Sequence, residues 1–344
     1  MRKSIIILGC VIIAGALTYA GIVMFANFNQ KPLGVRDRTN NNINVMLERL
    51  DNWEKIAGEA VISEEDMAII DGSTATIPVT AELFRQFFDF ADFEIYDNAV
   101  VYHSTTHDAY INLIDKSSRI WDERESRARA VSLIFVTPPS DEELDYAKSR
   151  GVELDLTPIA KDGFVFITHK DNPVDSLTIG QIQDIYSGKI TNWKEVGGED
   201  LEIRPYQREK NSGSQTAMEN LVMQGKEMLP PETVLADIWF GMGALVEAVA
   251  EYENGPSSIG YSYYYYLNNL YKNENIKVIE INDITPSNEN LISGLYPFST
   301  NYLAVMRKED NEDEDSPARK LRDYLVSPEG QKIIGMAGYC GAVS

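Results

Sequence analysis

Arg208 stands four residues ahead of a Ser-Gly-Ser sequence in the segment YQREKNSGSQTAMENLVMQG. A helical pattern begins at this sequence, so Ser212, Gly213 and Ser214 lie at a predicted helix start. The first amides of a helix lack acceptors within the helix and favour negative charge, and an arginine can bind two oxygens of an oxyanion. The segment therefore fits one wall of a site for a small oxyanion. The alternative is that Ser212 only caps the helix and Arg208 forms a surface ion pair.

Two other turns are rich in hydroxyl side chains, DGSTATIP and HSTTHDAY. In the first turn, Thr76 and the backbone amide of Ile77 stand just before or at a predicted helix start. In the second turn, Thr105 and Thr106 stand in the corresponding place. Helix capping explains each turn taken singly. Three such turns at strand ends that should face one cleft indicate an oxyanion-binding cleft.

Short apolar runs alternate with turns and helical segments from residue 66 onward. MAII, NAVVY and VSLIFV each precede a turn and a helix-patterned segment, and a second series begins with VELDLTPIAKDGFVFITHK. This order predicts an α/β fold with parallel strands covered by helices. The turns named above follow the carboxyl ends of predicted strands, which is the edge where such sheets bind ligands. A chain of 344 residues is long enough for two such lobes.

The chain is strongly acidic, with 53 Asp and Glu against 31 Lys and Arg and a formal net charge of −22. Nonspecific nucleic-acid binding needs a basic surface, so the composition argues against that class of protein. An anion site in such a chain must depend on local donors rather than on overall charge. The acidic run EDNEDED at 309–315 is predicted to be a solvated loop.

No motif in the sequence indicates catalysis or a metal site. GxSxG, HExxH and Walker sequences are missing, and we expect neither an enzyme nor a bound cofactor. Cys10 and Cys340 are too few for a cysteine metal site, and no disulfide is expected. His103 and His107 are four residues apart, but no third ligand is spaced for a metal. We interpret them as polar loop residues, with the alternative that His107 tunes affinity with pH.

The N-terminus has the pattern of a membrane anchor. Arg2 and Lys3 precede an uncharged stretch from Ile5 to Ala26, which as a helix would be about 33 Å long, enough to cross a bilayer. The two cations favour a cytoplasmic N-terminus, so the rest of the chain would lie on the outer side of the cell membrane. We expect an uncleaved single-pass anchor. A cleaved signal with secretion, and a lipid anchor at Cys10, are the alternatives.

The central and C-terminal segments resemble the phosphate-binding component of bacterial phosphate ABC importers. The resemblance lies in SLTIGQIQDIYSGKITNWKEVGGED, PYQREKNSGSQTAM, YPFSTNYLAV and SPEGQKIIGMAGY, and it extends from about residue 66 to 340. It implies a two-lobed periplasmic-binding-protein type II fold with a hinge, and chain crossings near Ile159–Lys161 and Leu295–Pro297. The expected parts are an anchor or signal (1–30), a tether with a short amphipathic helix (31–65), lobe 1 (66–160 plus 296–344) and lobe 2 (161–295).

The resemblance also implies which residues bind the ligand, because the family uses the turns after its first and second strands and the RxxxSG loop. The expected ligand-binding residues, which belong to these turns or to the turn after the third strand, are Thr76, Ile77, Thr105, Thr106, Thr137, Arg208, Ser212, Gly213 and Ser214. After the third strand, the best-known members have an aspartate that accepts the proton of bound phosphate, where this chain has Thr137. A hydroxyl can donate or accept, so the choice between phosphate and sulfate stays open.

The function implied is that of an extracytoplasmic solute-binding protein. Such a protein would capture inorganic phosphate, or a similar tetrahedral oxyanion, and deliver it to the permease subunits of an ABC importer. We expect a monomer that carries out no chemistry. A membrane-tethered oxyanion sensor or adhesion module without a transport role is the alternative, and a hydrolase acting on phosphorylated substrates is a third hypothesis.

Overall fold

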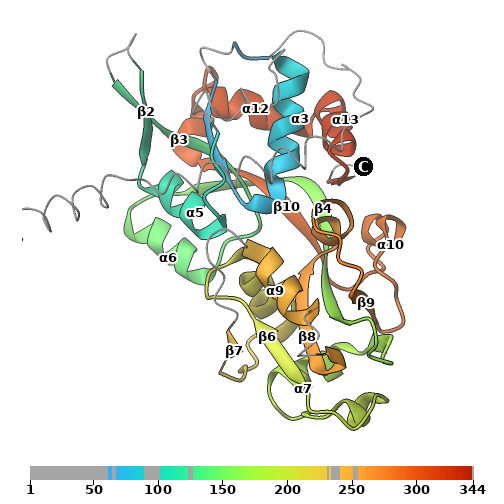
Figure 1. The fold of residues 1–344 in the computed structure, drawn as a ribbon. Coiled ribbons are helices and arrows are strands. Elements are labelled where there is room, and N and C mark those ends of the chain that lie inside the picture. Colours follow the sequence, from blue (N-terminus) through green and yellow to red (C-terminus); the bar gives the residue numbers. More distant parts are fainter. Residues whose placement is uncertain are drawn as a thin grey trace, which may run out of the picture. The chain divides into compact units, whose positions relative to one another are not determined.

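The computed structural model of the chain describes residues 61–63, 67–88, 101–122, 127–230, 232–233, 241–250 and 255–342 (Figure 1). All of them belong to one compact unit, Met46–Ser344. The predicted anchor and nearly all of the predicted tether and amphipathic helix lie outside the described residues. Within the described ranges, no helix is long and apolar enough to span a bilayer.

The described strands form one mixed sheet, which divides naturally into two parts. Its main order is β1 (Ile69–Gly72), β3 (Arg127–Val136), β10 (Ser299–Arg307), β4 (Leu154–His169), β8 (Ser258–Tyr263), β6 (Arg204–Gln207) and β7 (Glu232–Thr233). Four further strands pair at the sides: β2 (Ser118–Asp122) with β3, β11 (Cys340–Gly341) and β9 (Ile276–Ile281) with β4, and β5 (Ser176–Leu177) with β9.

Strand β4 joins the two parts of the sheet, because it changes its pairing partner halfway along. Residues 154–163 pair mainly with β10, whereas 164–168 pair with β8 and 166–169 with β9. We call β1, β3, β10 and the first part of β4 the first subsheet, and the second part of β4 with β8, β9 and β6 the second subsheet. The change of partner falls at Gly163–Phe164, a little beyond the predicted crossing at Ile159–Lys161.

The prediction of parallel strands is confirmed for some pairs and wrong for others. Strands β1 and β3 are parallel, and so are β6 and β8. However, β10 runs antiparallel to both β3 and β4, and β4 runs antiparallel to β8 and β9. Strand β10 comes from the C-terminal part of the sequence and enters between β3, which belongs to the first series, and β4, which begins the second.

Helices cover both faces of the first subsheet (Figure 1). One face packs against α3 (Ile77–Phe87), α12 (Pro317–Val326) and α13 (Pro328–Met336), and the other against α5 (Thr106–Ile114) and α6 (Asp141–Ser149). The second subsheet shares a separate core with α7 (Ile179–Tyr186) and α9 (Gly241–Ala250). The other helical segments include α8 (Gly213–Ala217), which runs into the π-helix η3 (Met218–Met223), α10 (Asn288–Ile292) and α11 (Lys308–Glu312).

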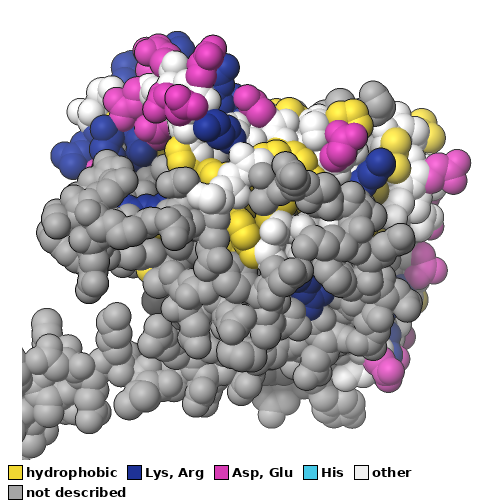
Figure 2. Space-filling model, turned by 90° about the horizontal axis from the view of Figure 1, so that it is seen from above, with side chains coloured by type: hydrophobic (Ala, Val, Ile, Leu, Met, Phe, Trp, Pro, Cys, Tyr) yellow, Lys and Arg dark blue, Asp and Glu magenta, His cyan; other side chains and the backbone are white. Residues whose placement is uncertain are grey.

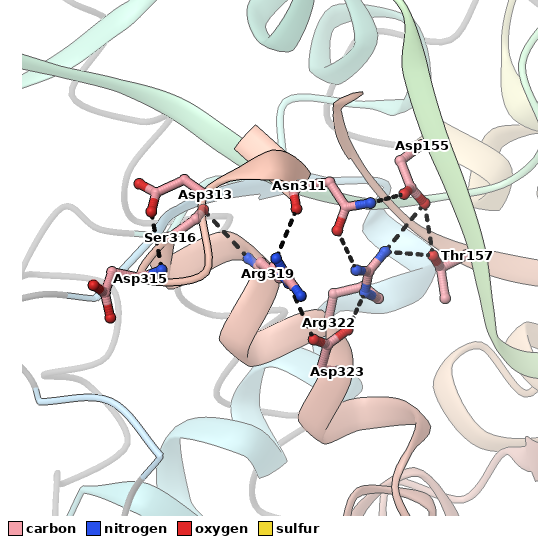
Figure 3. Close-up of polar contacts among 9 residues, drawn as sticks. All are labelled: Asp155, Thr157, Asn311, Asp313, Asp315, Ser316, Arg319, Arg322 and Asp323. Atoms are coloured by element: carbon pink, nitrogen blue, oxygen red, sulfur yellow. Dashed lines mark hydrogen bonds and ion pairs between the residues drawn. The ribbon is translucent and has the colours of Figure 1, made fainter. Parts of the chain in front are cut away.

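The acidic run is mostly exposed to solvent, as predicted, but its first residues are helical and are fastened to the sheet, which corrects the prediction of a loop. Helix α11 covers its first residues, and Asn311 accepts a hydrogen bond from the buried Arg322 (2.6 Å) and donates one to Asp155 on β4 (2.8 Å; Figure 3). Arg322 also binds Asp155 (3.2 Å) and Thr157 (3.1 Å). On the face drawn in Figure 2, Lys and Arg side chains lie among those of Asp and Glu. Local pairing of this kind offsets part of the repulsion that the excess of acidic residues causes.

Asp162 stands just before the point where β4 changes partner. Its carboxylate accepts hydrogen bonds from the amides of Gly163 (2.7 Å) and Tyr265 (3.0 Å) and from the hydroxyl of Tyr302 (3.0 Å). Tyr302 lies on β10 and Tyr265 follows β8, so this carboxylate links both subsheets to the crossing strand. Burial raises the pKa of Asp162 to about 7, although its hydrogen bonds act in the opposite direction.

We predict that the free energy of unfolding falls as the pH rises from about 4 to about 7, because Asp162 ionises in the unfolded chain at a lower pH than in the folded chain. In this window the folded chain holds a proton on Asp162 that the unfolded chain has released. The variant Asp162→Asn lacks this proton equilibrium. Its stability relative to the wild type should therefore increase with pH, by at most about 1.4 kcal/mol per pH unit. Urea unfolding of both proteins at several pH values measures this difference, and a difference that stays constant with pH would contradict the assignment.

Candidate functional site

Four turns that end strands carry the candidate site. In the first subsheet, the turns are 73–76 after β1, 102–105 after the bridge residue Val101, and 137–140 after β3. Because β1, β3 and the segment at Val101 run parallel, these turns lie at the same edge. The fourth turn, 208–212, follows β6 in the second subsheet and leads into α8.

Gly213 shows that turns from the two subsheets meet. A Cβ atom added at Gly213 would lie 2.4 Å from Oγ1 of Thr137 and 2.7 Å from Oγ1 of Thr106. Separations this short are sterically forbidden, so only a glycine allows the start of α8 to approach these two hydroxyls. Three of the predicted site residues are therefore brought together from three different turns.

Several hydroxyls at this meeting point are buried without a hydrogen-bond partner. Oγ of Ser214 forms no hydrogen bond with any described residue, and Oγ1 of Thr137 forms none of good geometry, although it interacts with the hydroxyl of Tyr263; the two residues are only 3% and 2% exposed. Oγ of the buried Ser73, in the first turn, also has no hydrogen-bond partner among the described residues. A buried polar atom left unpaired costs about 1–3 kcal/mol. Such atoms on facing turns suit a ligand whose oxygens can pair with them.

Arg208 is buried, with 6% of the residue exposed, and it is held by its neighbours. Its Nε and Nη2 atoms donate to the carboxylate of Glu209, at 2.9 and 2.6 Å, and its backbone amide donates to the hydroxyl of Tyr261 (2.8 Å). Partial burial raises the pKa of Glu209, but the hydrogen bonds and charge of Arg208 bring it below its ordinary value. No described residue accepts a hydrogen bond from Nη1, so one edge of the guanidinium keeps its donors available for an anion.

The donors of Thr76 and Ile77 already face backbone carbonyl groups of the first turn and of β3. The hydroxyl of Thr76 lies 2.9 Å from the carbonyl oxygen of Ser73 and 2.8 Å from that of Phe135, and the amide of Ile77 donates to the carbonyl of Thr74. These bonds shape the turn, in contrast to the direct donation that the family resemblance implies.

Thr105 and Ser212 each stand immediately before a helix. Thr105 has φ = 103°, a conformation that strains a β-branched residue, and its amide lies 3.3 Å from the carbonyl oxygen of Gly72. Ser212 caps α8, because its hydroxyl oxygen accepts from the amide of Gln215 (3.3 Å). That contact leaves the hydroxyl proton of Ser212 available to another acceptor.

Three residues that support the site were missed by the sequence analysis. Gln215 accepts from the amide of Arg208 (3.2 Å) and from the hydroxyl of Tyr261, and the hydroxyl of Tyr263 donates to the carbonyl of Gly213 (3.0 Å). Both tyrosines lie on β8, in the run SSIGYSYYYY, whose alternation indicates a strand but not its polar contacts.

The histidines differ in their environments. His103 lies beside the first turn, and its Nδ1 donates to the carbonyl of Ser73 (2.8 Å). The other ring nitrogen, Nε2, is therefore an acceptor, and Nε2 has no hydrogen-bond partner among the described residues. Burial lowers the pKa of His103 to about 4. His107, on α5, contacts Glu143 (2.9 Å), whose pKa is raised by burial. Within the described residues, no group of three His, Cys, Asp or Glu could hold a metal ion.

A polar bridge also joins the edges of the two subsheets. Glu142, in the first turn of α6, accepts a hydrogen bond from the side chain of Asn211 (2.8 Å) and forms an ion pair with Lys210. Lys210 and Asn211 belong to the turn after β6. The turns around the candidate site are thus connected at the surface as well as at Gly213.

Comparison with known proteins gives one family and several relatives. A family model described as the PBP superfamily domain matches residues 70–329. The phosphate-binding protein PstS of Borreliella burgdorferi is 26% identical over 185 residues, which is 54% of this chain and 65% of that protein. PstS of Bacillus subtilis is 26% identical over 176 residues, or 51% of this chain and 53% of that protein. The matched part thus spans less than two thirds of these relatives' length.

Solved structures resemble the chain over most of its length. A candidate phosphate ABC transporter substrate-binding protein from Clostridium perfringens, with bound phosphate, has a TM-score of 0.58 and 27% identity, covering 80% of this chain and 99% of that one. An ABC-type phosphate transport receptor from Vibrio cholerae has a TM-score of 0.54 and 20% identity, covering 79% and 99%. The second likeness supports the fold alone.

We predict that His103 stays neutral between pH 8 and pH 5.5, with its proton on Nδ1, because its pKa lies near 4. Long-range ¹H–¹⁵N spectra of the histidine rings distinguish the two tautomers and the charged form. His107, which is partly exposed, serves as the internal comparison. A charged His103 ring at pH 6, or a proton found on Nε2, would contradict the prediction.

Proposed function

This chain belongs to the PBP superfamily, and from that membership we propose that it captures inorganic phosphate outside the cytoplasm and delivers it to an ABC importer. Relatives that are named phosphate-binding proteins, and a similar structure that contains phosphate, support this ligand. These relatives are named as binding proteins. Because the capture and delivery of phosphate need no chemical step, we propose no enzymatic activity.

The close approach at Gly213 is the observation that carries the proposal. It brings the start of α8 against the hydroxyls of Thr106 and Thr137, with the unpaired hydroxyl of Ser214 beside it in the sequence. A tetrahedral oxyanion presents oxygens in several directions at once. It can therefore pair with donors that converge from different turns, which a planar or linear ligand of the same size would do less completely.

The proposed ligand contacts come from both subsheets. From the second, we propose Nη1 of Arg208, the hydroxyls of Ser212 and Ser214, and the first amides of α8 at Gly213 and Ser214, which have no acceptors within the helix. From the first, we propose the hydroxyls of Thr106 and Thr137. Thr105, Thr76 and Ile77 contribute by shaping their turns, and Ser73 offers a donor that the sequence analysis did not single out.

Local donors explain how a chain of net charge −22 can hold an anion. A buried guanidinium, hydroxyls and amides act at short range, whereas the surface carboxylates are screened by water and salt. Thr137 has a hydroxyl that can donate to an unprotonated oxygen or accept from a protonated one. We therefore expect phosphate to bind and expect discrimination against sulfate to be weaker than a carboxylate at that position would provide.

We further propose that the two subsheets belong to two lobes that close on the ligand. The crossing of β4 at Gly163–Phe164, and the chain's return before β10, would supply the hinge. Residues 1–30 would hold the protein at the outer face of the cell membrane, as their charge and apolar pattern indicate. The closed form would then dock on the permease subunits in the same membrane.

The variant Arg208→Ala should weaken phosphate binding by roughly 1.5–3 kcal/mol, on the order of 10- to 100-fold, because a charge-assisted hydrogen bond to a buried anion is lost. Titration calorimetry with phosphate, and with sulfate in parallel, measures the change. Arg204→Ala is the matched control, since Arg204 lies exposed on the same strand β6. An unchanged affinity in Arg208→Ala would show that the wrong turn was assigned, and a wild type that prefers sulfate would contradict the choice of ligand.

We also predict that Gly213→Ala weakens phosphate binding by about 1–3 kcal/mol, because the added methyl group would push α8 away from Thr106 and Thr137. The melting temperature without ligand should change little, since a shift between the turns relieves the clash. Gly335→Ala is the control, because a Cβ there meets nothing within 4 Å. Equal phosphate affinities in wild type and Gly213→Ala would mean that the turns do not close on the ligand.

A further inference from the structure

Asp71, the third residue of β1, is fully buried yet is not among the residues assigned to the site. Its Oδ1 accepts from the amides of Gly72 (2.7 Å) and Ser104 (2.9 Å). Its Oδ2 accepts from the hydroxyl of Ser104 (2.5 Å) and from the side-chain amide of Asn112 on α5 (2.9 Å). All four contacts bring a donor to the carboxylate, which is the pattern expected for an ionised group.

These contacts join the first and second turns of the candidate site. Among the described residues, the backbone contacts between β1 and the next segment are a bridge from Ile70 to Val101, a bond from the amide of Tyr102 to the carbonyl of Ile70 (2.8 Å) and one from the amide of Thr105 to the carbonyl of Gly72 (3.3 Å). Between these last two bonds, the carboxylate of Asp71 adds a side-chain connection through Ser104. The strained Thr105 follows directly, and then Thr106, whose hydroxyl faces Gly213.

Charge alone would make Asp71 unfavourable here. No described Lys or Arg forms an ion pair with it, and His103, whose charge would interact with Asp71, is held neutral at physiological pH. A buried carboxylate near an anion site repels the anion in a medium of low dielectric constant. The charge of Asp71 should therefore weaken ligand binding, whereas its hydrogen bonds to the second turn should strengthen it. Because the two effects have opposite signs, an experiment can separate them.

We propose that Asp71 is a positioning residue of the oxyanion site, which holds the turn 102–105 so that the hydroxyl of Thr106 lies against Gly213. This inference rests on the proposed function. Asp71 does not touch the ligand in this arrangement. It acts through Ser104 and Asn112, whose own contact (3.2 Å) completes a closed ring of hydrogen bonds.

The test compares phosphate affinity, by calorimetry, in the wild type, Asp71→Asn, Ser104→Ala, Asn112→Ala and the double variant Asp71→Asn/Ser104→Ala. We expect Asp71→Asn to weaken binding about tenfold or more, although it removes a repelling charge. The amide nitrogen cannot accept from the Asn112 side chain as Oδ2 does, and the remaining hydrogen bonds lose the charge of the carboxylate. The double variant should bind about as well as Asp71→Asn alone, since both changes break the same connection. Ser104→Thr, which keeps the hydroxyl, should restore most of the affinity lost in Ser104→Ala.

Controls separate a positioning role from a general loss of stability. Thr168→Val removes a buried hydrogen bond to Ser258 in the second subsheet, and it should lower the melting temperature without changing phosphate affinity. Amide hydrogen exchange should become faster at 102–106 in Asp71→Asn and stay unchanged at 131–136 in β3. If Asp71→Asn fails to fold, the series Ser104→Ala, Ser104→Thr and Asn112→Ala decides by the same criteria.

Tighter or unchanged phosphate binding in Asp71→Asn would overturn the proposal, because repulsion would then be the main effect of the carboxylate. Fully additive losses in the double variant would also overturn it. A wild-type protein that binds no phosphate would instead contradict the proposed function. In that case, hydrogen exchange at 102–106 still decides whether Asp71 holds the turn.

Discussion

The close contact between Gly213 and the hydroxyls of Thr106 and Thr137 is the constraint on which the rest of the candidate site depends. It requires a residue without a side chain at the start of α8, and it requires turns from both subsheets to end at the same place. Strand order satisfies the second condition, because β4 carries the sheet from one part to the other without a break. The site is therefore a product of the whole sheet and not of any one loop.

Hydrogen bonding around this contact follows a simple division. Groups that shape the turns are fully paired, as shown by the carboxylate of Asp71 and the hydroxyl of Thr76. Other buried hydroxyls beside the contact have no hydrogen-bond partner of good geometry among the described residues, as shown by Thr137 and Ser214. Paired groups that fix each turn, combined with unpaired donors, are the arrangement expected of a preorganised anion site.

The sequence was sufficient to predict the strand–turn–helix order, because apolar runs and capping residues act locally. Spacing and family resemblance likewise led to Arg208, Gly213 and Thr137. Hydrogen-bond partners were beyond such reasoning. Thr76 lies beside the carbonyl of Phe135, 59 residues away in the sequence, and Arg208 pairs with its own neighbour Glu209. The antiparallel direction of β10 was equally unpredictable, because strand pairing is decided by tertiary contacts and not by the strand's own composition.

The place of β10 has a consequence for how the chain acquires its structure. This strand, Ser299–Arg307, lies between β3 and β4, although those two strands come more than a hundred residues earlier in the order of synthesis. A nascent chain that has not yet extended past residue 307 has no strand to fill the middle of its first subsheet. One edge of β3 and the first part of β4 therefore lack this partner until residues 299–307 have been synthesised, and chains dominated by such distant contacts fold slowly.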